Sequence, residues 1–130
     1  MKRITTIILF FIILTSSTCQ KEVKHYDLTV KNTANASIYV TWTDAYPDTL
    51  IRCPLGYSEI LPGKSYDIKS GKYGWENDFK GMQFLQIFII DAITGSTEAC
   101  DTIRLHNMIL KRYTLTYENL QQINWKITYP

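Results

Sequence analysis

Residues 83–91, with the sequence QFLQIFIID, decide the fold of this 130-residue chain. Successive side chains of a β-strand point to opposite faces, and here apolar residues occupy both alternating sets. A strand that is apolar on both faces is typical of the centre of a sheet that is covered on each side. We therefore predict a central strand at residues 83–91, with the rest of the domain packed around it.

Shorter segments on either side show the alternation of a half-buried strand. Residues 26–31 and 38–43 are close enough in sequence to predict a hairpin. Pro54 and Gly56 separate two short β-like pieces, which we expect at a sheet edge. The remaining predicted strands and edge pieces are residues 50–53, 57–60, 66–68, 108–115 and 123–129.

Helices are predicted only in connections. Thr116 has the chemistry of a helix N-cap, and Asn119 stands where a full capping box has Glu. Residues 98–105 predict a short helix, and residues 75–81 predict one helical turn or a loop. The pattern indicates an all-β, mostly antiparallel β-sandwich, Ig-like or related, with one or two short helices, and a small barrel is the alternative.

The N-terminus has the layout of an export signal. Lys2 and Arg3 precede an apolar run at residues 4–14, and small polar residues lead to Cys19. The run of about 11 residues is shorter than the roughly 20 that a membrane-spanning helix needs. We predict a lipoprotein-type signal peptide at residues 1–18, a lipidated Cys19 with a polar tether at 19–25, and one domain at 26–130.

Charge argues against nucleic acid as a partner. Without residues 1–18 the chain keeps 12 of its 14 basic residues beside 12 acidic ones, so its formal charge is zero. No basic cluster is denser than Lys111 with Arg112. A protein that binds DNA or RNA needs a positively charged surface to hold the phosphates.

Cys53 and Cys100 remain as an even pair if Cys19 carries lipid. In an oxidising compartment they can form a disulfide, which stabilises by at most about 4 kcal/mol for a loop of this length. Two free, buried cysteines are the alternative. If Cys19 is instead left as a thiol by the ordinary signal peptidase, the count of cysteines is odd.

The C-terminal segments 109–115 and 124–130, ILKRYTL and NWKITYP, resemble the ending of small lipoproteins of the Bacteroidota. Residues 46–49 and 87–92 are similar too. The resemblance implies a lipid-anchored envelope protein of the outer membrane, and it implies no activity and no functional residues.

Catalytic motifs do not stand out, so we predict no catalytic residues, no metal and no cofactor. His106 with Cys100 and Asp101 lacks the signature of a nucleophilic site. A hydrolase that uses loop carboxylates is the alternative, and it would draw on one of two pairs of acids. These pairs are Asp44 with Asp48, and Glu76 with Asp78.

Ligand contact is predicted at Trp75 and Tyr73, because their loop mixes large rings with acids and an amide. Such a surface suits a glycan or an envelope protein. Thr49 and Thr102 each follow an Asp in a pattern that resembles an O-glycosylation acceptor, although the same residues are also typical of turns. The sequence therefore indicates a lipid-anchored, non-catalytic binding or structural module of the cell envelope.

Cys19 is expected to be the mature, lipidated N-terminus, because it follows the apolar run directly. Stable anchoring requires at least two acyl chains. Mass spectrometry of the protein purified from cells should find a diacylglyceryl group on Cys19. A free thiol there, or a mature chain that starts elsewhere, contradicts the prediction.

Overall fold

A computed structural model describes residues 21–53 and 56–130, so the predicted signal peptide and Cys19 lie outside the described residues. The strands are β1 (Asp27–Asn32), β2 (Ile38–Thr43), β3 (Ser58–Ile60), β4 (Ser65–Lys69), β5 (Leu85–Asp91), β6 (Lys111–Leu115) and β7 (Lys126–Tyr129). The helices are α2 (Trp75–Asp78), α3 (Ala92–Thr97), α4 (Cys100–Leu105) and α5 (Tyr117–Gln122).

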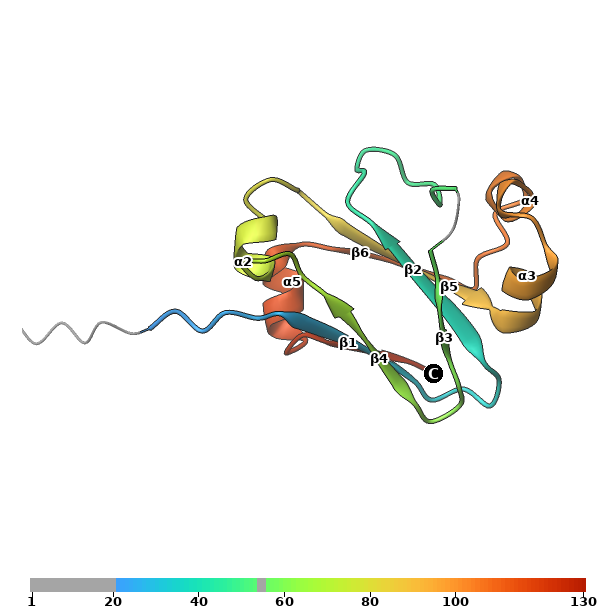
Figure 1. Ribbon diagram of the computed structural model, residues 1–130, viewed down its shortest axis with the longest axis horizontal. Coiled ribbons are helices and arrows are strands. Elements are labelled where there is room, and N and C mark those ends of the chain that lie inside the picture. The colour runs from blue at the N-terminus through green and yellow to red at the C-terminus, as the bar shows by residue number, and fades with distance from the viewer. Residues whose placement is uncertain (1–20, 54–55) are drawn as a thin grey trace, which may run out of the picture.

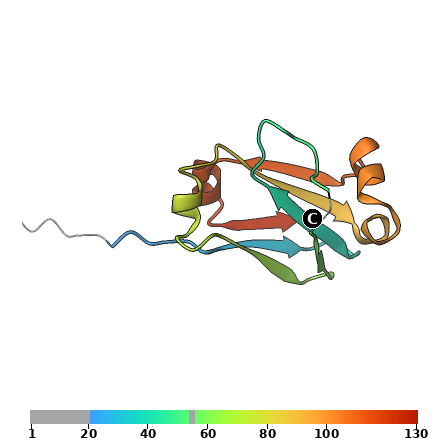
Figure 2. The same ribbon diagram turned by 45° about the horizontal axis from the view of Figure 1, so that its top comes forward.

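The strands form two layers, which confirms the predicted all-β sandwich (Figure 1). One sheet has the order β4-β1-β7, in which β1 pairs antiparallel with β4 and parallel with β7. The other has the order β3-β2-β5-β6 and is antiparallel throughout. Figure 2 shows the two layers nearly edge-on, with α2 and α5 at one end and α3 and α4 at the other.

β5 is central and apolar on both faces, as predicted. Leu85, Ile87 and Ile89 belong to the main core between the sheets. Phe88 and Ile90 belong to a second cluster with two further buried residues, Ile51 and Ile103. The outer face of the sheet is therefore closed by the β2–β3 connection and by α4.

The predicted hairpin of β1 and β2 is wrong, because the two strands belong to different sheets. The chain crosses from one layer to the other at Asn32, the last residue of β1, whose side chain is fully buried. Its Nδ2 donates to the carbonyls of Ala36, at 2.8 Å, and Ile60, at 2.9 Å. Its Oδ1 accepts from the backbone N of Ala34 at 3.0 Å. Asn32 thus links the crossing turn to the end of β3.

The C-terminal strand is shorter than predicted. Asn124 and Trp125 have φ angles of 50° and 56°, which interrupt any extended strand before Lys126. Helix α5 precedes them, and Thr116 and Asn119 form the reciprocal capping box at its start. The backbone N of Trp125 then donates to the carbonyl of Leu120 at 2.9 Å. The turn places the Trp125 ring in the main core.

Two other connections differ from the prediction. Residues 50–53 form no strand, because Ile51 turns inward to cover Phe88 rather than pairing at a sheet edge. Residues 92–105 form two short helices, α3 and α4, instead of one. Asp91 caps α3 by accepting from the backbone N of Thr94 at 3.0 Å.

Replacing Asn32 should test the crossing turn. Asn32→Ala leaves the carbonyl of Ile60 buried without its donor, so the free energy of unfolding should fall by about 3 kcal/mol. Denaturant unfolding measures the change. Asn35→Ala, at an exposed position of the same turn, is the matched control and should be nearly neutral. Equal effects of the two variants would contradict the role given to Asn32.

Candidate functional site

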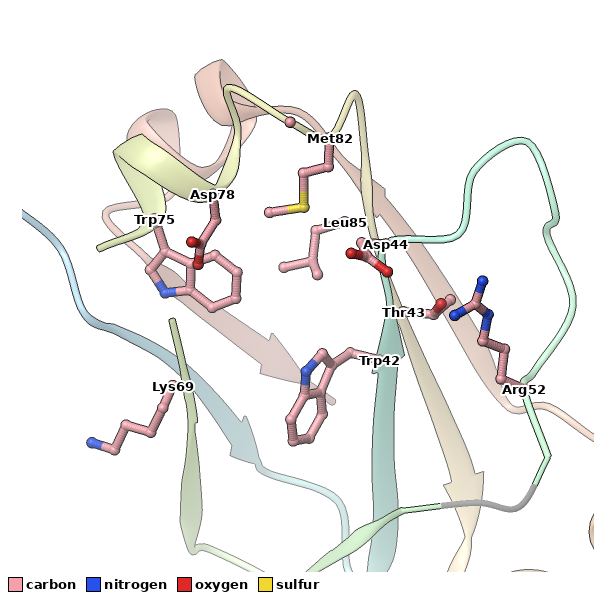
Figure 3. A pocket seen from close by; sticks show the side chains of 10 residues that line it. Trp42, Thr43, Asp44, Arg52, Lys69, Trp75, Asp78, Met82 and Leu85 are labelled. Atoms are coloured by element: carbon pink, nitrogen blue, oxygen red, sulfur yellow. The ribbon is translucent and has the colours of Figure 1, made fainter. Parts of the chain in front are cut away.

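A hollow of about 520 Å³ lies at one end of the sandwich, between α2, the end of β2 and the start of β5 (Figure 3). Aromatic and apolar side chains share its wall with charged ones. The lining residues are Trp42, Thr43, Asp44, Arg52, Lys69, Trp75, Asp78, Gly81, Met82 and Leu85. Four charged side chains stand beside four apolar ones, so the lining is more polar than that of most sites for small, drug-like ligands.

Two tryptophans come to the hollow from separate parts of the chain. Trp42 lies near the end of β2, half-buried, with its ring 6.2 Å from that of Tyr66. Trp75 opens α2, and its ring lies 6.4 Å from that of Phe79. Trp42 stands on the apolar side of the alternating segment 38–43, which predicts a core residue and nothing more. Its place beside Asp44 at the end of a strand is the one sequence signal that could have found the hollow.

The prediction that Trp75 and Tyr73 form one exposed contact surface is wrong. Trp75 is only 3% exposed, whereas Tyr73 is 56% exposed and does not line the hollow. Gly74 between them has a φ of 86°, and the backbone N of Trp75 donates to the carbonyl of His25 at 2.8 Å. This turn directs the indole into the open end of the core, where burial of a large ring is favourable.

The indole Nε1 of Trp75 is buried and has no hydrogen-bond partner among the described residues. A buried donor without an acceptor costs about 1–3 kcal/mol. Unsatisfied groups of this kind are rare in folded proteins and call for an explanation. Because this atom is buried, the unpaired donor is a cost of packing the Trp75 ring in the core and is not open to a ligand.

Two carboxylates, Asp44 and Asp78, lie on opposite sides of the hollow (Figure 3). Asp44 is exposed, directly after β2. Asp78 ends α2, and its Oδ2 accepts from the backbone N of Gly71 at 2.8 Å. Lys69 lines the hollow too, but its Nζ lies 2.6 Å from Asp27 Oδ1. Asp44 is therefore available to a ligand, while Asp78 also holds its own loop.

The structure does not assemble either predicted pair of carboxylates at the hollow. Asp48 lies 3.8 Å from Arg104, and its Oδ1 accepts from the backbone N of Leu50. Glu76 turns away to His25. One member of each pair, Asp44 and Asp78, reaches the hollow. The sequence missed this combination, because it depends on how α2 packs against the end of β2.

Cys53 and Cys100 are joined in a disulfide, with their Cα atoms 5.8 Å apart. Cys100 is therefore not a free thiol beside His106, which caps the end of α4. Within residues 21–53 and 56–130 no three His, Cys, Asp or Glu side chains gather as a metal site would require. Thr49 is exposed, while Thr102 is half-buried in α4.

His25, predicted as part of the tether, packs against the domain. Its ring stacks on Trp125, with centroids 4.5 Å apart and planes 15° apart. Its Nδ1 lies 2.6 Å from Glu76 Oε1, and its backbone N donates to both carboxylate oxygens at 3.1 and 3.0 Å. We call this set of contacts the His25 clamp. The sequence missed it because His25 stands among polar residues that have no pattern.

The His25 clamp also changes the acidity of Glu76. Partial burial acts to raise the pKa of its carboxyl, but the hydrogen bonds from His25 and from the backbone outweigh burial and lower that pKa. A carboxyl whose pKa is lower in the folded state stabilises the fold above its unfolded pKa. This stability is lost as the pH falls through the lowered value.

The chain matches no known protein family, no curated protein and no solved structure. No helix in the described part of the chain is long and apolar enough to cross a membrane.

Glu76→Gln should weaken the His25 clamp and reduce acid sensitivity. The native protein is expected to lose stability as the pH drops below the ordinary Glu value of 4.5, because the carboxylate that His25 binds becomes protonated. Unfolding at a series of pH values between neutral and acid measures this. Glu118→Gln, in the first turn of α5, is the control and should keep the native pH dependence. An unchanged profile in Glu76→Gln would contradict the assignment.

Proposed function

We propose that this chain is a lipid-anchored protein of the cell envelope, and that it acts as a non-catalytic binding module through the hollow at the end of its sandwich. The observation that carries the binding role is that two tryptophans line the hollow together with the exposed carboxylate of Asp44. The export signal and the position of Cys19 support the anchor.

The lining favours a glycan as the ligand. Indole rings offer flat apolar faces against which the C–H face of a sugar ring can pack. Carboxylates such as Asp44 accept hydrogen bonds from hydroxyls, and hydrogen bonds to charged groups are the stronger kind. Because the hollow is open on one side, an extended glycan chain can enter it.

We favour binding over hydrolysis for a structural reason. A hydrolase of the two-carboxylate type needs two carboxyl groups that are both free to act on the substrate, one as an acid and the other as a base or nucleophile. Asp78 instead accepts a hydrogen bond from the backbone N of Gly71, and a Cβ added to Gly71 would lie 2.9 Å from its Oδ1. Its carboxylate is thus packed closely against its own loop.

Asp44→Asn should test the hollow as the binding site. The purified native protein is first screened on a glycan array, and the affinity of the best ligand is measured by calorimetry. The variant should bind at least about tenfold more weakly, because a hydrogen bond to a charged acceptor contributes about 1.5–3 kcal/mol.

Glu98→Gln is the matched control, since it makes the same chemical change at an exposed position after α3. It should bind as the native protein does. Equal affinities for Asp44→Asn and the native protein would remove the hollow as the site. Binding of no glycan by the native protein would overturn the ligand class.

A further inference from the structure

We propose that the edge of the domain where the tether leaves, formed by α2 and α5, rests on the lipid surface through Tyr73 and Ile123, two residues that do not line the hollow. This inference rests on the lipid anchor of the proposed function. The partner is the phospholipid bilayer to which the chain is attached. Three features support this orientation: the point where the tether leaves the domain, the length of the tether and the side chains around that point.

The His25 clamp fixes where the tether leaves the domain. His25 is held by Glu76 of α2 through three contacts and by the Trp125 ring through stacking. Its carbonyl accepts from the backbone N of Trp75. The free part of the tether therefore ends at Lys24, at the α2 and α5 end of the molecule (Figure 1). The opposite end carries α3 and α4.

The tether is too short for the domain to rotate freely relative to the membrane. Six residue steps separate Cys19 from His25, and an extended chain spans at most about 3.6 Å per residue. The clamped end therefore stays within about 22 Å of the lipid-bearing residue. The residues beside His25 can therefore contact a bilayer in which Cys19 is anchored, whereas α3 and α4 lie at the far end of the domain.

Large exposed side chains surround this point. Tyr73 is 56% exposed and precedes Gly74, where an added Cβ would lie 3.1 Å from the His25 carbonyl oxygen and 3.5 Å from the Lys24 Cβ. Ile123 is 37% exposed and lies two residues before Trp125, the ring on which His25 stacks. Tyr26, next to His25, is also exposed. Tyrosine is enriched at membrane–water interfaces, because its ring is apolar and its hydroxyl is polar.

Charge contributes little to the proposed contact. Lys21, Lys24 and Lys72 lie near the tether or its exit, but Glu22 and Glu118 accompany them. A mixed set of charges gives only weak attraction to anionic headgroups. The contact should therefore depend on the rings and on Ile123, and it should persist at high salt.

Paramagnetic lipids test the orientation. The isotopically labelled, lipidated protein is purified from membranes and placed in nanodiscs of phosphatidylethanolamine and phosphatidylglycerol, with and without a spin-labelled lipid. The backbone amide signals of Tyr73 and Ile123 should lose most of their intensity with the spin label. Those of Ile93 and Leu105, which are exposed at the opposite end, should keep theirs.

Variants show whether the side chains of Tyr73 and Ile123 contact the bilayer or only lie near it. Tyr73→Ser combined with Ile123→Ser should reduce the loss of signal at Gly74, while Ile93→Ser combined with Leu105→Ser should leave it unchanged. All four positions are exposed, so each variant is expected to fold. His25→Ala frees the tether and should also reduce the loss.

Signal loss at both ends, at neither end, or at α3 and α4 alone would overturn the orientation while the lipid anchor stands. Protein that mass spectrometry shows to lack lipid, and that is absent from membranes, would overturn the anchor itself and this inference with it. The two failures are therefore distinguishable.

Discussion

The rest of the structure depends on the burial of both faces of β5. Its inner face needs a second sheet, which β4, β1 and β7 supply. Its outer face exposes Phe88 and Ile90 unless another part of the chain covers them. Ile51 and Ile103 do so from two segments far apart in sequence, and the disulfide between Cys53 and Cys100 joins those same segments. The fold is a sandwich with a third, partial layer.

The hollow follows from the same requirement. The chain after β2 has to leave the sheet so that Ile51 can cover the outer face of β5. The amide of Gln86, a buried residue of β5, donates to the carbonyl of Asp48 at 2.7 Å and holds this connection in place. The end of the sandwich beside Asp44 is then covered only by α2. Trp75 closes it only in part, and the space between Trp75 and Trp42 remains as the hollow.

The sequence predicts what depends on local pattern. The two apolar faces of β5, the alternation in β1 and the cap of α5 at Thr116 are all properties of a few neighbouring residues, and the structure has each of them. The predicted alternation in β2 is wrong, because Thr41 and Thr43 are buried and Trp42 is half-buried. The layer to which each strand belongs is a different matter. It depends on Asn32, whose side-chain amide donates a hydrogen bond to the carbonyl of Ile60, 28 residues later in the chain.

The candidate site was harder to predict for the same reason. Tyr73 and Trp75 are two residues apart, and their sequence context does not show that only Trp75 turns inward. That outcome depends on a hydrogen bond from Trp75 to the carbonyl of His25, about 50 residues earlier in the chain. The role of His25 is equally invisible, because Glu76 and Trp125 come to it from distant segments. Residue type alone suggests chemistry, and only packing decides which residues meet.

Helix α2 connects the tether to the hollow. It has four residues, and a helix this short has no stability of its own. Its position is therefore fixed by its side chains, which contact three different parts of the domain. Trp75 enters the core, Glu76 holds His25, and Asp78 binds the loop at Gly71 while facing the hollow. Because one helical turn makes all three contacts, the wall of the hollow and the attachment of the tether are parts of a single packed unit.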